Sequence, residues 1–593
     1  MKKFWSLLLV VALVLSCASM AFAEPEDLTE LPRNETVYVA GQAWGTPNNF
    51  NIFALSNTAW PVAGSMRELI YESLYMYNMI TNENEPLIAE SQPVWEDDYT
   101  FTVKMKENVH FSNGDPMTSA DVVYTYNIAD ENNGGVYTTW TNIWTYFEKV
   151  EAVDEYTIRF TIKEEPYNKA MPISKLANVR IVPKGVSEAL FESCDNDVTK
   201  VREQFVENPI GSGAFKLAFY DNTRIVLERD DNYWGTAENM FGKLTQVKYY
   251  VHPLFNDNAA GNLALANGEI DISQQFVADT GNLVATGNYK TFYDEPPYQL
   301  GFGSPSLLFN LEKDGLKDPV VHHAIARCLD YEAIAQNAMS GMTDKMTICF
   351  LNPTLYGDYI DFDDEELSEL MWDTSDIDGN LETANQMLEE AGYVDVDGDG
   401  FRELPDGSKL EWKAECPTGW SDWNASLEIL CESAKKIGLN IVTYFPESSV
   451  YTVDYQTGNF EILMMSPYGS PSTAQPYEAC YNVLYSKDVP PTGTEAVHNY
   501  NRYANADVDA LIEQLGATQD PDEMKECVTA IVKQWLVDMP TVQLMYRPYA
   551  FQTVYTGVWN GWSDSSSDVP PCVMMDGASI RDLYNIYPVE TAE

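Results

Sequence analysis

Patterns typical of β-strands and α-helices alternate along nearly the whole chain, and this alternation limits the possible folds more than any other feature. Polar and apolar residues alternate at 100–105, 156–162 and 224–228, as in strands with one buried face. Apolar residues recur at helical spacing at 258–268 and 427–437, and a glycine marks the end of each segment. Strands interleaved with helices predict an α/β protein with mixed sheets.

The length of the chain requires more than one hydrophobic core. A chain of 593 residues, 45% of them hydrophobic, predicts two or three domains. A further helix is expected to start after Thr118, with Asp121 completing a capping box. Other strands are expected at 36–39, 270–275, 410–416 and 441–445, and other helices at 66–77, 320–338 and 381–391.

The strong excess of acidic residues excludes one class of function. The chain has 90 Asp and Glu residues against 36 Lys and Arg, which gives a formal net charge of −54. A field of this sign repels nucleic acid and anionic lipid, so no DNA or RNA partner is expected. The charge keeps the protein soluble and disfavours anionic ligands, unless a local site overrides the global field.

The first residues have the pattern of a secretory signal. Lys2 and Lys3 precede an apolar run, 4–15, that is too short to anchor the chain across a bilayer. Cleavage after Ala23 is favoured, because 21–23 reads Ala-Phe-Ala, over lipidation at Cys17 in an imperfect lipobox. The protein is therefore expected to be exported, to the periplasm or the outer face of the cytoplasmic membrane.

Cysteines are scattered along the rest of the chain. Eight remain if the signal is removed, and no CxxC spacing occurs among them. Export would permit disulfide bonds, but sequence does not assign their pairing. We expect most of these cysteines to be buried free thiols.

Seven segments in order along the chain resemble the large solute-binding proteins of the peptide and nickel importer class, the family-5 extracellular binding proteins. The segments are 70–74 (IYESL), 95–103 (WEDDYTFTV), 109–122 (VHFSNGDPMTSADV), 208–217 (NPIGSGAFKL), 224–229 (RIVLER), 232–235 (NYWG) and 318–330 (DPVVHHAIARCLD). Each alone has a structural explanation, such as a turn before a capped helix. Together they make the resemblance specific.

The resemblance implies a periplasmic-binding-protein-like fold, in which two lobes enclose a central cleft and one lobe carries an inserted subdomain. Lobe I would combine 24–75, 207–300 and 546–593, the inserted subdomain would span 76–206, and lobe II would span 301–545. The lobes would close over a small-molecule ligand by hinge motion, and the protein, expected to be a monomer, would deliver that ligand to the permease subunits of an ABC importer.

Two ligand classes stay open, an oligosaccharide and an oligopeptide. Peptide-binding members of the family usually hold the α-amino group of the peptide with an Asp, but the corresponding segment here, 462–471, contains none. A buried ammonium group without a counter-charge carries a large penalty. Other segments, 44–51 and 417–423, resemble the oligosaccharide-binding branch.

Aromatic and amide side chains suit a sugar, because indole rings cover its apolar faces and Asn or Ser bind its hydroxyl groups. The same Trp residues are equally compatible with core positions. The candidate ligand-binding residues are Trp44, Asn48, Asn49, Trp60, Trp420, Trp423 and Tyr468.

One acidic segment resembles the start of an EF-hand loop. Asp395, Asp397 and Asp399 stand at positions 1, 3 and 5, Glu403 at position 9 and Asp406 at position 12. The usual Glu at position 12 is missing, and the segment lies between an expected helix and an expected strand. A Ca²⁺ site and a solvated acidic hairpin are both compatible with it, and no other cofactor is expected.

The chain carries no recognisable catalytic motif. Its five His residues have no zinc-binding spacing, and no GxSxG or Cys–His signature is present. Paired carboxylates abound in so acidic a chain and say little about glycosidase chemistry. We therefore expect a binding protein without catalytic residues, with a secreted glycoside hydrolase as the alternative of another class.

Overall fold

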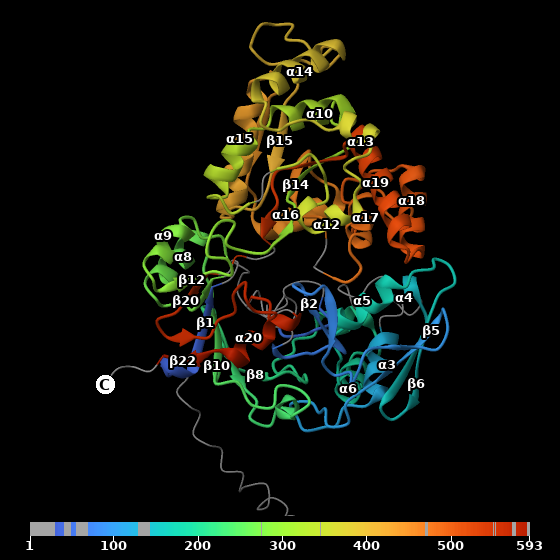
Figure 1. The fold of residues 1–593 in the computed structure, drawn as a ribbon, viewed down its shortest axis with the longest axis vertical. Helices are drawn as coiled ribbons and strands as arrows, with labels where there is room; N and C mark the ends of the chain where they lie inside the picture. Colours follow the sequence, from blue (N-terminus) through green and yellow to red (C-terminus); the bar gives the residue numbers. More distant parts are fainter. Residues whose placement is uncertain are drawn as a thin grey trace, which may run out of the picture.

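The computed structural model describes residues 30–40, 49–54, 69–128, 143–273, 275–343, 346–468, 472–548, 551, 553–571 and 577–589. Three larger sheets organise these residues, each with its own helices. We use lobe I for the part built on a seven-stranded sheet, inserted subdomain for the part built on a four-stranded sheet, and lobe II for the part built on a five-stranded sheet. In Figure 1 lobe II forms the top, lobe I the lower left and the inserted subdomain the lower right.

Lobe I has the strand order β12-β20-β11-β1-β10-β9-β8. The central strand β1 runs parallel to β10 and β11, whereas every other neighbouring pair is antiparallel, so the sheet is mixed as expected. Four of its five residues are buried, as a strand between two others requires. The elements are β1 (Thr36–Ala40), β8 (Phe215–Tyr220), β9 (Arg224–Arg229), β10 (Tyr249–Pro253), α8 (Asn258–Ala266), β11 (Ile272–Ser273), α9 (Thr280–Ala285), β12 (Tyr289–Lys290) and β20 (Thr553–Tyr555).

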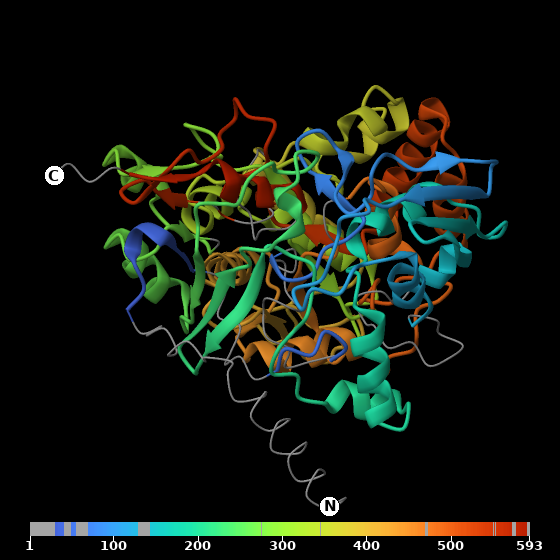
Figure 2. The same cartoon turned by 90° about the horizontal axis from the view of Figure 1, so that it is seen from below.

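The inserted subdomain has an antiparallel sheet in the order β4-β5-β7-β6. Thr118 caps helix α3, and Asp121 completes the capping box that the sequence predicts. Figure 2 shows this subdomain, in blue and cyan, beside the green and red elements of lobe I. The elements are β2 (Tyr75–Asn78), β3 (Glu83–Pro86), β4 (Val94–Trp95), β5 (Thr100–Lys104), α3 (Ser119–Asn127), α4 (Ile143–Tyr146), β6 (Phe147–Asp154), β7 (Thr157–Ile162), α5 (Ala170–Asn178), α6 (Lys184–Ser193) and α7 (Val198–Glu203).

Lobe II has the strand order β16-β15-β17-β14-β18, with β15 parallel to both its neighbours and β14 antiparallel to both of its own. Apolar residues of the sheet and of its covering helices form one large buried cluster. The elements are β14 (Ser306–Phe309), α10 (Pro319–Cys328), α11 (Tyr331–Ala333), α12 (Pro353–Tyr356), α13 (Glu365–Leu370), α14 (Ile377–Glu390), β15 (Trp412–Glu415), α15 (Ser421–Lys435), β16 (Ile441–Tyr444), α16 (Ser448–Thr457), β17 (Ile462–Met465), α17 (Tyr477–Leu484), α18 (Ala506–Ala517), α19 (Pro521–Asp538) and β18 (Thr541–Gln543).

Two short strands connect the lobes. β13 (Gly301–Gly303) lies in the chain between β12 of lobe I and β14 of lobe II, and β19 (Arg547–Pro548) lies between β18 and β20 on the return. The two strands pair with each other in antiparallel register. The last described elements, β21 (Trp559–Asn560), α20 (Asp582–Asn585) and β22 (Tyr587–Pro588), return to lobe I, where the Trp559 indole donates to the carbonyl oxygen of Thr36 at 2.9 Å.

Most of the predicted elements are confirmed, but two helices differ. The helix predicted at 66–77 is wrong from residue 71 onward, because 75–78 form strand β2, and 66–68 lie outside the described residues. Residues 69–76 are all buried. The apolar residues in this segment therefore do not mark the buried face of a helix, and their spacing did not indicate one. The helix predicted at 320–338 is broken, since α10 ends at Cys328 and Asp330 caps a new short helix, followed by a π-helical turn at Ile334–Ala338.

Two further expectations concern cysteines and membrane spans. The seven cysteines in the described part of the chain are all buried free thiols, as expected, whereas Cys17 and Cys572 lie outside it. Among the described residues no helix has the length and apolar character needed to cross a membrane. The signal predicted within 1–23 also lies outside the described residues, and the division into lobes by residue number stays a prediction.

Candidate functional site

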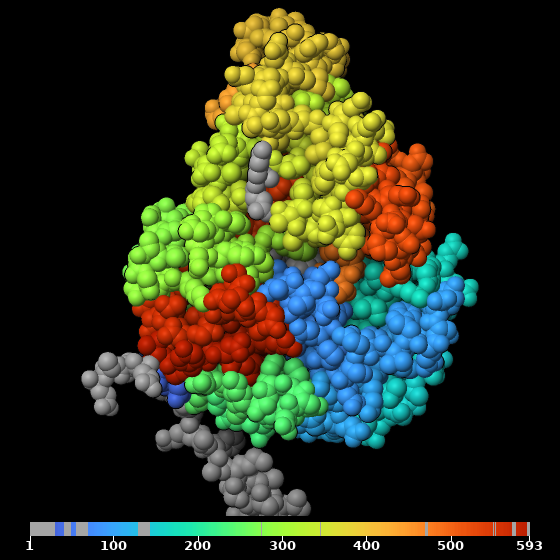
Figure 3. Space-filling view, in the orientation of Figure 1, coloured from blue at the N-terminus to red at the C-terminus, as the bar shows by residue number. Residues whose placement is uncertain are grey.

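A cavity of about 340 Å³ lies between lobe I and lobe II, next to the two connecting strands. Figure 3 shows one face of the molecule, on which the yellow surface of lobe II meets the green, red and blue surfaces below it. The volume falls in the usual range for small-molecule sites. The lining residues are Asn256, Asp257, Asn258, Gln275, Phe276, Phe302, Gly303, Pro305, Thr418, Gly419, Trp420, Asp422, Trp423, Ser448, Tyr451, Thr452, Tyr455, Met465, Ser466, Arg547 and Pro548.

Aromatic rings form the lobe II side of this cavity. Trp420 and Trp423 stand at the start of helix α15, and their rings meet edge to face with centroids 4.9 Å apart. Tyr451 and Tyr455 stand one helical turn apart on α16, and Tyr451 lies beside Trp420 at 6.4 Å. Gly419, with φ +80°, makes the turn that brings Trp420 from strand β15 into the helix.

The most buried charge in the cavity is already paired. The Arg547 guanidinium donates from Nε to Asp422 Oδ2 at 2.8 Å, and the two side chains are 17% and 2% exposed. Arg547 also stacks over the ring of Phe551 at 4.4 Å. Since a buried carboxylate is stable only with a partner, this ion pair leaves the inner wall electrically neutral.

Amide and hydroxyl groups complete the cavity from lobe I. Asn258 Nδ2, on α8, donates to Ser421 Oγ of lobe II at 3.1 Å and so bridges the two lobes. Gln275 Nε2 donates to the Asn258 carbonyl oxygen at 2.7 Å. Asp257, the other carboxylate of the lining, caps α8 by accepting from the amide of Ala260 at 2.8 Å. The cavity therefore offers rings and neutral hydrogen-bonding groups around an internal ion pair.

The sequence-predicted ligand residues are distributed unevenly. Trp420 and Trp423 line the cavity, whereas Trp44, Asn48 and Trp60 lie outside the described residues. Ligand binding by all seven predicted residues stays a prediction.

The other two predicted residues lie elsewhere in the fold. Asn49 accepts with Oδ1 from the amides of Asn51 and Val206, which holds a local turn. Tyr468 is buried, and its hydroxyl accepts from Gln543 Nε2 at 2.8 Å. Neither residue is part of the cavity wall described above.

Sequence reasoning missed much of the cavity. Phe276, Phe302, Tyr451, Tyr455 and Arg547 come from four separate stretches of the chain, and no local motif marks them. The one available signal was the spacing of Tyr451 and Tyr455, which is also that of an ordinary amphipathic helix.

The five predicted calcium ligands do not all converge. The carboxylates of Asp395, Asp397 and Asp399 lie within 4.8 Å of one another and are exposed. Lys409 Nζ forms ion pairs with the carboxylates of Asp397 and Asp399, each at 2.8 Å.

The remaining two carboxylates of this segment have other partners. Glu403 is buried and accepts from the amide of Val396 at 2.7 Å, and Asp406 accepts from the Ser408 hydroxyl. Three exposed carboxylates, two of them paired with one lysine, fit a solvated hairpin as well as an ion site, and calcium binding stays a prediction.

Two lobes joined by paired strands around an internal cavity define a solute-binding protein of the periplasmic-binding class. The sequence places the chain more narrowly: it belongs to the bacterial extracellular solute-binding proteins, family 5, because the model of that family's middle region matches residues 83–490. The resemblance expected from the sequence is confirmed. Members of this family serve ABC importers, so the chain is an exported solute-binding protein of such an importer.

Relatives and solved structures agree with this assignment. The oligopeptide-binding protein AppA of Bacillus subtilis is 24% identical over 517 residues, which cover 82% of this chain and 86% of the relative. The nickel-binding periplasmic protein of Escherichia coli is 21% identical and covers 70% of this chain and 75% of its own length. A periplasmic oligopeptide-binding protein of Thermotoga maritima, crystallised with mannohexaose, superposes with a TM-score of 0.82 at 26% identity, covering 95% of this chain and 100% of that one. The two-lobed fold is thereby confirmed, and these relatives are binding proteins rather than enzymes.

Proposed function

We propose that this protein binds a neutral oligosaccharide in the cavity between the lobes and delivers it to the permease subunits of its ABC importer. It acts as a monomer outside the cytoplasm and catalyses no reaction on the sugar. The observation that supports the proposal best is the cavity wall itself, which combines the rings of Trp420, Trp423 and Tyr451 with an ion pair that is already complete. Rings bind the apolar faces of sugars, and a neutral ligand needs no buried counter-charge.

The structural relative with bound mannohexaose supports this ligand class. Its name is that of an oligopeptide-binding protein, yet it holds a saccharide, so the name of a relative does not decide the ligand. It is 26% identical and covers 95% of this chain, so its bound saccharide supports the proposal.

A second candidate ligand is an oligopeptide, and the Asp422–Arg547 pair favours it. Asp422 would hold the α-amino group of the peptide in place of the Arg547 guanidinium. The name of AppA points the same way. Binding would then replace one buried ion pair by another, and Arg547 would need a new partner.

A thermal-shift screen followed by calorimetry separates the candidates. The panel contains manno- and cello-oligosaccharides of two to six units and peptides of three to nine residues. We expect the saccharides to raise the melting temperature, since a ligand that binds only the folded state stabilises it. Tight binding of peptides without any saccharide response would overturn the proposal, and shortening of a bound saccharide on incubation would favour the hydrolase.

A further inference from the structure

A second cavity, of about 530 Å³, lies between lobe II and the inserted subdomain. Its lobe II wall comes from α17 and from residues 485–516, and its opposite wall from residues 144–168. In Figure 1 α17 stands above α4 and α5, the helices that contain or flank the residues that form the opposite wall. The first cavity contains none of these residues.

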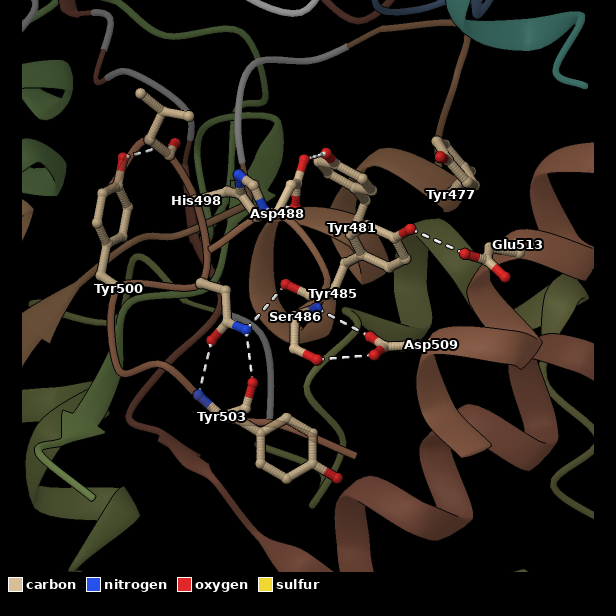
Figure 4. Close-up of polar contacts among 12 residues, drawn as sticks. Tyr477, Tyr481, Tyr485, Ser486, Asp488, His498, Tyr500, Tyr503, Asp509 and Glu513 are labelled. Carbon is tan, nitrogen blue, oxygen red and sulfur yellow. Dashed lines mark hydrogen bonds and ion pairs between the residues drawn. The ribbon is translucent and has the colours of Figure 1, made fainter. Parts of the chain in front are cut away.

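A row of tyrosines forms the lobe II wall. Tyr477, Tyr481 and Tyr485 follow one another at one-turn spacing. Figure 4 shows all three, with the polar partners of Tyr481 and Tyr485. The rings of Tyr481 and Tyr485 are stacked, with centroids 4.8 Å apart and planes at 21°, and Tyr477 lies 6.0 Å from Tyr481. Such a row presents an extended aromatic surface to the cavity.

Acidic and basic groups at the rim balance one another. Asp488 accepts from the Tyr481 hydroxyl at 2.6 Å, and Glu513 accepts from Tyr485 at 2.8 Å and from Lys487 at 2.6 Å. With Lys163 from the inserted subdomain, the lining holds two cations and two carboxylates. A neutral ligand fits this balance better than a charged one.

Two buried polar atoms in the lining, Asn168 Nδ2 and His498 Nδ1, have no hydrogen-bond partner among the described residues. His498 is 4% exposed, and its Nε2 lies 2.9 Å from Asp488 Oδ1. Its other ring nitrogen, Nδ1, is buried without a hydrogen-bond partner among the described residues. Buried polar atoms are nearly always paired, so this unpaired nitrogen beside the cavity is uncommon.

The facing wall is aromatic as well. Trp144 and Tyr167 line it from the inserted subdomain. The hydroxyl groups of Tyr146 and Tyr477 lie 3.2 Å apart and join the two walls at one side. A planar or ring-shaped ligand would therefore have aromatic surfaces on both sides.

A series of packed rings runs through lobe II from the first cavity to Tyr500, next to the second cavity. From Trp420 and Tyr451 in the first cavity the series passes to Tyr455, and Tyr455 meets Tyr500 edge to face at 4.9 Å. The Tyr500 hydroxyl donates to the carbonyl oxygen of Val497 at 3.0 Å, and Val497 lines the second cavity.

From these contacts we infer that the second cavity is a distal subsite for the same oligosaccharide, which holds the sugar units that extend beyond the first cavity. This inference rests on the proposed function and specifies it further: the preferred ligand is an elongated chain that touches lobe I, lobe II and the inserted subdomain at once. Affinity should therefore increase with chain length well beyond a disaccharide.

The test is calorimetry with mannobiose, mannohexaose, cellobiose and cellohexaose on the full chain. The wild type should bind one hexasaccharide at least about tenfold more tightly than its disaccharide, the gain from one further stacked ring. Tyr167→Ala and Tyr485→Ala, which change opposite walls, should each remove most of that gain and leave the disaccharide affinity within about twofold. Tyr444→Ala, an exposed tyrosine of β16 outside both cavities, is the matched control and should change neither affinity.

The outcomes separate this inference from the function on which it rests. Equal affinity for the two lengths, or a length effect that both variants retain, would overturn the distal subsite and leave the oligosaccharide proposal standing. Absence of binding to all four saccharides would overturn both. A melting curve for each variant shows that a lost affinity does not come from unfolding.

Discussion

Removing the Trp420 ring is the most direct test of the first cavity. Trp420 is half-buried, lines the cavity and packs edge to face on Trp423. A sugar stacked on one indole face would remove about 100 Å² of apolar surface from water, worth ~2.5 kcal/mol at ~25 cal/mol per Å². Trp420→Ala should therefore weaken oligosaccharide binding roughly 60-fold.

The fold should survive this substitution. The lost edge-to-face pair with Trp423 costs about 1 kcal/mol, a small part of the stability of a protein of this size. The assay is isothermal calorimetry with the best saccharide of the screen, together with a melting curve.

A matched control is available in the same lobe. Trp372 is also half-buried, and its ring stacks under the Arg327 guanidinium at 4.0 Å, away from both cavities. Trp372→Ala should lower the melting temperature slightly and leave affinity unchanged. If Trp420→Ala binds the saccharide as tightly as the wild type, the ring is not a stacking platform and the reasoning from the cavity wall is refuted.

Three further predictions concern salt, pH and calcium. Saccharide affinity should change less than about twofold between ~0.05 and ~0.5 M NaCl, because screening has no ligand charge to act on; a large loss, measured by calorimetry, would indicate a charged ligand. Burial, with the nearby Asp454, raises the pKa of Glu415 to about 8, so the folded state holds this proton more tightly than the unfolded state. The stability that protonated Glu415 contributes is thus present at low pH and lost as the pH rises. Between about pH 5 and about pH 9 the melting temperature should therefore fall more in the wild type than in Glu415→Gln. Parallel curves of melting temperature against pH would contradict this. The calcium prediction requires that EDTA lower the melting temperature of the wild type but not of Asp397→Ala, and identical curves with and without EDTA would leave only the hairpin.

Sequence patterns correctly predicted the strands and helices that have one buried face and one exposed face. Strand β7 alternates buried and half-buried residues, and Thr118 and Asp121 form a cap within four residues, so both could be read directly. The segment 69–76 is buried on every side and offered no such contrast. Its Glu72 bonds Tyr233 and Trp234, which are more than 160 residues further along the chain.

The residues of the candidate site likewise divide into those that local sequence could predict and those that it could not. Trp420 and Trp423 could be predicted because they stand three residues apart in one loop and share a helix start. Arg547 could not, because its partner Asp422 is 125 residues away in the sequence. Residues 462–471 contain no Asp, whereas the buried carboxylate of the cavity, Asp422, comes from α15.

The pairing of β13 with β19 has a mechanical consequence. Two separate strands could slide past each other, but a hydrogen-bonded pair bends as one unit, so a hinge motion of lobe II would be guided by it. The first cavity touches this strand pair through Phe302, Gly303, Arg547 and Pro548, whereas the lining of the second contains no residue of either strand. If an elongated ligand occupies both cavities, one end would therefore press on the connecting strands themselves and the other would act away from them. The angle between the closed lobes would then depend on the length of the bound ligand.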